Sequence, residues 1–303
     1  LGAFSGEGDL TYFVDQDGES TAQSYSGKDL TDKPAIVLMD SGSASASEIF
    51  AGGVLGTGSG IVIGTRSYGK GVAQVLYDES NCPYLHGDAV KVTAYRFYCA
   101  GGNTTDRIGV VPTLYIPQDQ AVAAARLLSG ERTKDSAYLR LVLNGCDFYI
   151  DISAAKEISS TVLEAILTAL TPDAVLYWGE NGGERKLTLA QAREKCGFAA
   201  SSALDFSDVA DSEYAEEIDS LAASRIVFGD GGKFRPDATM TRAEVCALLA
   251  QALDLYSTAN GYFTDVAKGS WYAPSVNAMA AIGLVSGVGG GKFDPNATMT
   301  QEE

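Results

Sequence analysis

Residues 35–56 read AIVLMDSGSASASEIFAGGVLG, and this stretch decides the fold of the N-terminal part of the chain. The apolar run at 35–39 is typical of a buried strand, and residues 45–56 predict a helix that follows it directly. A second apolar run, IVIG at 61–64, predicts another buried strand. Strand, helix and strand in this order indicate an α/β layer.

The serines between the first strand and the helix allow two interpretations. Serine is an ordinary N-cap residue, so these hydroxyls can simply begin the helix. A hydroxyl at an abrupt strand-to-helix turn can also act as a nucleophile. There the first N–H groups of the helix, and the positive end of its dipole, favour a developing oxyanion. The turn by itself leaves both interpretations open.

A nucleophilic serine needs a base, and the chain offers few. A Ser-His-Asp triad would have to use the single histidine, His86, in the loop NCPYLHGD, where a solvated side chain is the simpler interpretation. One histidine also leaves too few ligands for a histidine-based zinc site. Lys70 lies between two glycines in SYGKGVAQ. It can act as a base once desolvation lowers its pKa, although a solvated loop lysine is the alternative.

The chain divides by pattern into four segments: 1–130, 131–203, 204–260 and 261–303. In the first, residues 72–77 and 89–98 predict an antiparallel pair, 110–116 a last strand and 118–130 a helix. In the second, the sequence predicts a hairpin at Asn144-Gly145, a helix at 159–170, a strand at 174–179 and a capped helix at 188–197. Nothing in 131–203 carries chemistry, so we interpret it as a small α+β spacer.

From residue 204 the sequence repeats. FSDV at 206 returns as FTDV at 263, and GKFRPDATMTRAE at 232–244 returns as GKFDPNATMTQEE at 291–303. The offsets between the copies are 57 residues (263 − 206) and 59 residues (291 − 232), and a period of this length indicates an array of supersecondary units. We expect each unit to contain helices that run into a Gly-rich loop, with a capped helix at TMTRAEVCALLAQAL.

The composition excludes several classes of function. The 303 residues carry a net charge of −17 without a basic cluster, which argues against nucleic acid or an anionic membrane as partner. No apolar run approaches the ~20 residues of a membrane span. The five cysteines are scattered and imply no disulfide framework. Because the chain starts at Leu1 and stops inside a repeat, we expect it to be a fragment, in which the absence of a signal peptide is uninformative.

Four features of residues 1–117 point to one family: the Ser segment, the G-K-G-x-x-Q segment, the strand ending at a Gly turn and the G-V-x-P exit. Together they resemble the S41 carboxyl-terminal processing (tail-specific) serine peptidases. The resemblance implies a crotonase-like (crotonase/ClpP-like) ββα peptidase core, of which 1–130 is the C-terminal portion. It also implies a Ser45/Lys70 dyad, with Gln74 orienting the lysine and the N–H of Ala46 in the oxyanion hole. No metal or cofactor is implied.

The chain departs from that family in one respect. The family has an upstream Asp-Leu-Arg-x-Asn-x-Gly-Gly segment that supplies the second oxyanion donor, and a PDZ domain that binds the substrate's tail. Neither is present in these residues, so we expect the fragment alone to be inactive.

Residues 204–303 resemble S-layer homology (SLH) modules, a first module at 204–260 and a truncated second at 261–303. That resemblance implies α-helical repeats that bind anionic, often pyruvylated, cell-wall polysaccharide. Arg242 matches the arginine of the T-R-A-E motif, although a local ion pair is the alternative, and Gln301 replaces it in the second module. Trp271 can stack on sugar, but we favour core packing.

Together these patterns predict an extracellular serine endopeptidase, anchored by its SLH modules to a Gram-positive-type cell wall, that cleaves exported polypeptides near their tails. One alternative is a catalytically inert surface protein that binds peptide tails and wall polysaccharide. Another is an acyl-transfer enzyme with a different substrate.

Overall fold

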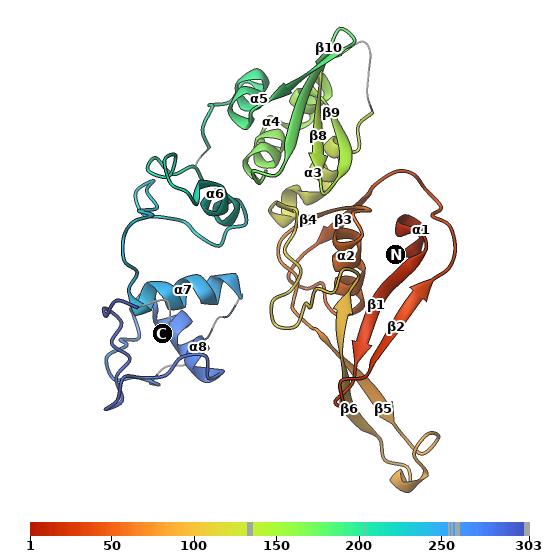
Figure 1. Cartoon of the computed structure of the whole chain (residues 1–303), viewed down its shortest axis with the longest axis vertical. Helices are drawn as coiled ribbons and strands as arrows, with labels where there is room; N and C mark the ends of the chain where they lie inside the picture. Colours follow the sequence, from red (N-terminus) through yellow and green to blue (C-terminus); the bar gives the residue numbers. More distant parts are fainter. Residues whose placement is uncertain (132–135, 203, 254, 256, 258–260, 300–303) are drawn as a thin grey trace. The chain divides into compact units, whose positions relative to one another are not determined.

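The computed structural model describes the chain except residues 132–135, 203, 254, 256, 258–260 and 300–303. Two compact units are present, Leu1–Ala203 and Leu204–Glu303. The described part of the chain contains no helix with both the length and the hydrophobicity that a membrane span requires. The whole is a mixed α/β protein (Figure 1).

A three-stranded parallel sheet lies next to the predicted turn. Its order is β3 (Ala35–Met39), β4 (Gly60–Gly64), β7 (Leu114–Tyr115), and α2 (Ala46–Gly56) is the crossover between β3 and β4. The predictions of two strands and a helix are confirmed. β4 is buried throughout, but β3 is an edge strand, and its Leu38 side chain is 44% exposed. The strand predicted at 110–116 is only two residues long.

A second sheet is antiparallel and has the order β2 (Ser20–Tyr25), β1 (Gly8–Val14), β6 (Val90–Cys99), β5 (Val72–Tyr77). The predicted pairing of β5 with β6 is confirmed. Their hairpin projects past the ends of β1 and β2 (Figure 1), and its tip contains the 3₁₀ turn η1 (Pro83–Leu85). His86 follows that turn and is exposed. The short helix α1 (Gly2–Ser5) precedes β1.

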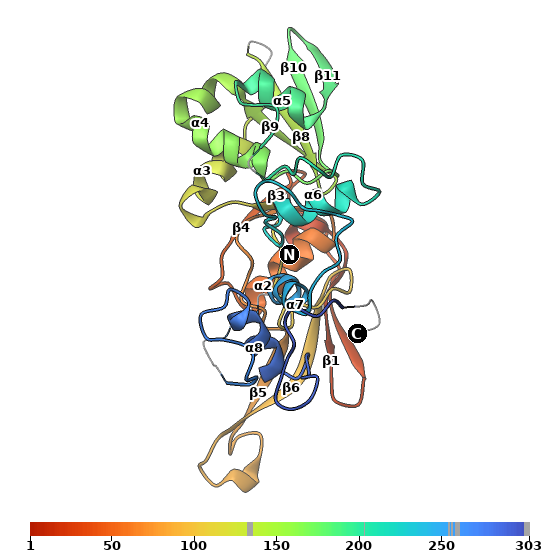
Figure 2. The ribbon, with the colours of Figure 1, turned by 90° about the vertical axis from the view of Figure 1, so that its left-hand side faces the viewer.

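The third sheet has the antiparallel order β11 (Gly183–Leu187), β10 (Val175–Glu180), β8 (Tyr138–Leu143), β9 (Cys146–Asp151). Helices α3 (Gln118–Leu128), α4 (Ile152–Thr168) and α5 (Leu189–Cys196) pack on one of its faces (Figure 2). The hairpin predicted at Asn144-Gly145 is confirmed, and both residues have positive φ. The capping box of α5 at Thr188 is also confirmed. α4 begins at Ile152, but its helical backbone is interrupted at the predicted start, Ser159 (φ −173°, ψ 109°), whose Oγ accepts from Val162 N at 3.2 Å.

One hydrophobic core joins the parallel sheet to the third sheet, because Ile61 and Leu114 share a buried cluster with residues of α3, β8 and α4. Asn144 strengthens this junction: its Nδ2 donates to the carbonyls of Leu55 at 3.1 Å and Gly60 at 2.9 Å, just where α2 turns into β4. The segment 131–203 therefore buttresses the turn between α2 and β4.

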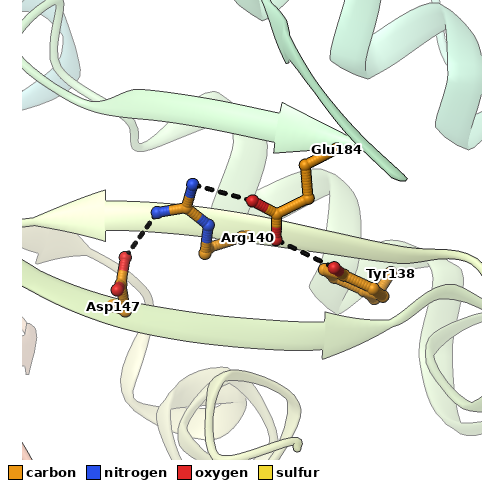
Figure 3. A network of polar contacts seen from close by, with 4 residues as sticks. All are labelled: Tyr138, Arg140, Asp147 and Glu184. Atoms are coloured by element: carbon orange, nitrogen blue, oxygen red, sulfur yellow. Dashed lines mark hydrogen bonds and ion pairs between the residues drawn. The ribbon is translucent and has the colours of Figure 1, made fainter. Parts of the chain in front are cut away.

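The other face of the third sheet carries a polar network (Figure 3). The guanidinium of Arg140 donates to Asp147 at 2.8 Å and to Glu184 at 2.9 Å, and the hydroxyl of Tyr138 donates to the second oxygen of Glu184. The guanidinium also lies 3.9 Å from the ring centroid of Tyr177. These contacts connect β8, β9 and β11 across the sheet.

The second unit contains α6 (Ala215–Ala223), α7 (Arg242–Ala252) and α8 (Ala273–Ala281). The two repeats share one device: Asp208 accepts from the backbone N–H groups of Phe234 and Arg235, and Asp265 accepts from those of Phe293 and Asp294. The hydrogen bond from Phe234 holds the pKa of Asp208 below its usual value. The capped helix predicted after TMT is confirmed for α7, with Thr241 as N-cap. The equivalent position in the second repeat, Gln301, lies outside the described residues.

Candidate active site

Ser45 is the N-cap of α2 and has an unusual backbone, with φ 58° and ψ −114°. A positive φ is uncommon for a residue other than glycine and is strained by roughly 1–3 kcal/mol. Such strain persists only where the surrounding structure enforces it. The sequence explains the location, because β3 ends at Met39 and α2 begins at Ala46, so the chain must reverse within six residues.

Ala46 is exposed and is the first residue of α2. Its backbone N–H has no acceptor among the residues that the structure describes, as is usual in the first turn of a helix. An open pocket of about 440 Å³ lies between β3 and α2 and reaches Ala46 and Ser47, with Val37, Met39 and Phe50 among its lining residues. An N–H donor and an apolar pocket therefore lie directly beside Ser45.

Lys70 is half-buried in the loop that connects β4 to β5. Gly69 has a φ of 88°, and its carbonyl accepts from Arg107 N at 2.8 Å. A Cβ on Gly71 would lie 2.4 Å from the Cα of Asp106. The two glycines thus let the lysine loop lie against the backbone of 105–109.

Gln74 lies on β5 at an irregularity in the register with β6, and its side chain is exposed. Its Nε2 donates to Thr93 Oγ1 at 3.5 Å. Within the described chain, this hydrogen bond points to β6 and not to Lys70, so the orienting role expected from the family resemblance stays a prediction.

Two buried residues that the sequence reasoning missed join the serine turn to the lysine loop. Glu48 is fully buried on α2, and its Oε2 accepts from the backbone N–H of Ser45 at 2.8 Å and from that of Lys70 at 2.9 Å. Its Oε1 accepts from Ser67 Oγ at 2.5 Å and from Gly69 N at 2.7 Å. The S-x-x-E spacing of Ser45 and Glu48 is typical of a capping box, but it predicts only the bond from Ser45 N to Glu48 and none of the three bonds from the lysine loop.

Cys99 packs behind α2, where its Sγ lies 3.5 Å from the carbonyl oxygen of Glu48. Burial, followed by the negative charge of Glu48, raises the pKa of its thiol to about 11. A thiol of that kind stays protonated and unreactive near neutral pH. Cys99 therefore packs as a small buried hydrophobic side chain. Cys196 and Cys246 are also buried, whereas Cys82 and Cys146 are only half-buried.

In the second unit the guanidinium of Arg242 is engaged within the protein. It donates to the carbonyls of Phe293 and Ser286, each at 2.9 Å, and lies 4.7 Å from the ring centroid of Phe293. These contacts connect the first repeat to the second. Trp271 is 66% exposed and makes an edge contact with Tyr272, so the expectation of core packing was wrong.

The comparisons with known proteins match two parts of the chain to two different families. The model of peptidase family S41 matches residues 1–116, and the S-layer homology domain matches residues 205–246 and 262–303. This match identifies residues 1–116 as a segment similar to peptidase family S41. The S41 segment thus contains the strained Ser45, the N–H of Ala46, the loop of Lys70 and the buried Glu48, and the SLH segment contains Arg242 and Trp271.

Relatives of the S41 segment include two curated bacterial proteases. The carboxyl-terminal-processing protease of a Picosynechococcus species is 30% identical over 110 residues, 36% of this chain and 25% of that protein. CtpB, the carboxy-terminal processing protease of Bacillus subtilis, is 34% identical over 121 residues, 38% of this chain and 24% of that protein. The chain thus spans about a quarter of the length of these relatives.

A solved structure, the photosystem II D1 C-terminal processing protease, is 30% identical, with a TM-score of 0.35, and the match covers 41% of this chain and 32% of that one.

Proposed function

We propose that this chain belongs to a cell-surface serine endopeptidase that uses a Ser45/Lys70 dyad on a crotonase-like core, with catalytic residues in 1–130, a spacer in 131–203 and SLH modules at 204–260 and 261–303. One observation carries the proposal: Ser45 has a strained backbone at a strand-to-helix turn, and its N–H shares one carboxylate oxygen with the N–H of Lys70. Strained backbone of this kind is concentrated at functional sites.

The chemistry proposed is acyl transfer in two steps. Neutral Lys70 Nζ takes the proton of Ser45 Oγ as Oγ bonds to the scissile carbonyl carbon, and the N–H of Ala46 donates to the oxyanion. The C–N bond then breaks and Lys70 returns the proton to the leaving amine. In the second step Lys70 takes a proton from water, which attacks the ester, and Ser45 Oγ leaves with that proton. The apolar pocket beside Ala46 is available for a substrate side chain.

Capture of the acyl-enzyme tests this proposal. The full-length gene product would be mixed with an unstructured polypeptide substrate, quenched in acid within one turnover, and digested for mass spectrometry. We expect the peptide that contains Ser45 to carry an N-terminal fragment of the substrate. The Ser45→Ala variant should lose the adduct, and Ser41→Ala, a change at an exposed serine of the same turn, should retain it. An adduct at another residue would remove Ser45 from the role of nucleophile, and no cleavage by the wild type would favour the inert binding protein.

The SLH segment supports a second part of the proposal, that wall polysaccharide anchors the enzyme outside the cell. The exposed ring of Trp271 is free to stack on a sugar. Arg242 is proposed to support the same surface, through its bonds to Phe293 and Ser286, with donors left over for an anionic group.

Wall binding can be measured by sedimentation of the full-length protein with purified cell walls. We expect binding to walls that retain their secondary polysaccharide and none to walls stripped of it. Trp271→Ala should weaken binding about tenfold through the lost stacking. Tyr84→Ala, which removes an exposed ring of the β5–β6 hairpin, should bind like the wild type. Equal sedimentation with intact and stripped walls would contradict the anchoring role.

A further inference from the structure

The four hydrogen bonds of Glu48 have a distribution that helix capping does not explain. In a capping box the glutamate side chain accepts only one bond, from the N-cap N–H, which here is Ser45 N. The other three donors, Ser67 Oγ, Gly69 N and Lys70 N, lie 19 to 22 residues further along the chain, on the lysine loop. Most of the binding capacity of this carboxylate is therefore directed at the loop that carries the proposed base.

The donors also define the form of the Glu48 side chain. Three of the four are backbone N–H groups, which can only donate, and the two oxygens accept two bonds each. An ionised carboxylate only accepts hydrogen bonds, and a site in which all four bonds are accepted suits that form. Burial of such a charge is tolerated when several donors compensate it.

Ser67 orients the carboxylate from the far side. Its side chain is 1% exposed, and its hydroxyl accepts from Val110 N at 2.6 Å. Because Val110 supplies a proton to that oxygen, the single proton of the hydroxyl is left for Glu48, to which it donates at 2.5 Å. Gly109 makes this approach possible, since a Cβ there would lie 2.5 Å from the Ser67 carbonyl.

We propose that Glu48 and Ser67 form a positioning pair that holds the turn of Ser45 and the loop of Lys70 in the register needed for proton transfer. This inference rests on the proposed Ser/Lys mechanism. Neither residue touches the reacting atoms: Glu48 acts on the backbone of both dyad members, and Ser67 acts through Glu48. A displacement of about 1 Å between reacting groups can lower turnover by about 100-fold, so a loss of register has a measurable effect.

Two variants of the full-length protein test the pair. Glu48→Gln keeps the shape but, in either orientation of the amide, turns its NH₂ toward at least one backbone N–H donor, and we expect kcat to fall roughly 100-fold with KM within a few-fold. Ser67→Ala leaves Glu48 in place and should lower kcat roughly tenfold, so it keeps the test open if Glu48→Gln does not fold. Matched controls are Glu79→Gln and Ser80→Ala at the exposed hairpin tip, which should behave as the wild type.

Amide hydrogen exchange supplies the readout that is independent of activity. We expect the N–H groups of Ser45, Gly69 and Lys70 to exchange faster in both variants, while those of β4 stay protected. The inference is wrong if these three amides exchange as in the wild type, or if kcat in both variants equals that of the controls. If the wild type cleaves nothing, the Ser/Lys mechanism fails, and the exchange data still decide whether Glu48 holds the two segments together.

Discussion

Replacing Lys70 by methionine should reduce kcat/KM of the full-length protein by about 10³-fold or more, because a general base contributes about 10²–10⁴-fold to turnover and Ser45 would lose the proton acceptor that we propose for it. Methionine matches the length of the lysine stem, and the bond from the backbone of residue 70 to Glu48 does not depend on the side chain. The loop should therefore stay in place while the chemistry is lost.

Lys70→Arg separates a base from a simple positive charge. Arginine keeps the charge but stays protonated in proteins, so it cannot accept the proton of Ser45. We expect it to be as inactive as Lys70→Met. Cleavage of an unstructured protein followed by gel and mass spectrometry measures both, with Lys91→Arg on the exposed part of β6 as control. Substantial activity in Lys70→Arg would remove Lys70 from the role of base.

The strand, helix and turn that position Ser45 could be predicted from the sequence because their signals are local. An apolar run, small residues and the S-x-x-E spacing all lie within 35–56. The Asn144-Gly145 dipeptide likewise favours a hairpin turn by itself. The strands β1, β2 and β11 were not predicted. β2 and β11 are polar edge strands with mostly exposed residues, so neither shows the alternation that a half-buried strand would. β1 lies inside its sheet, between β2 and β6, but only one of its seven residues is buried.

The link between Ser45 and Lys70 is tertiary, and this explains why the sequence did not reveal it. Glu48 reads as an ordinary helix residue and Ser67 as an ordinary loop residue, and only the packing of α2 against the loop after β4 brings them together. The prediction for Trp271 was wrong because it relied on the usual behaviour of the residue type. Tryptophan is most often packed inside, and here the edge contact with Tyr272 leaves its ring exposed.

The far end of α2 is as constrained as the end that carries Ser45, and Gly56→Ala should therefore destabilise the first unit by about 3 kcal/mol. A Cβ at residue 56 would lie 1.9 Å from the carbonyl oxygen of Ala100 and 2.8 Å from its carbonyl carbon. Both atoms are backbone and cannot turn aside as a side chain would. The gain in helix propensity from glycine to alanine, about 1 kcal/mol, is smaller than the cost of displacing α2 or the turn after β6.

Thermal and urea unfolding of the full chain would measure this effect, and a loss of about 3 kcal/mol corresponds to a fall in Tm of roughly 6–12 °C for a unit of this size. Gly183→Ala on the exposed β11 is the matched control, because the nearest atom to its Cβ would be 3.8 Å away. We expect that variant to unfold within about 0.5 kcal/mol of the wild type. Equal stability of the two variants would mean that α2 can shift away from Ala100. Since Glu48 and Ser45 lie on the same helix, a tolerated shift would also weaken the case that their register with Lys70 is held rigidly.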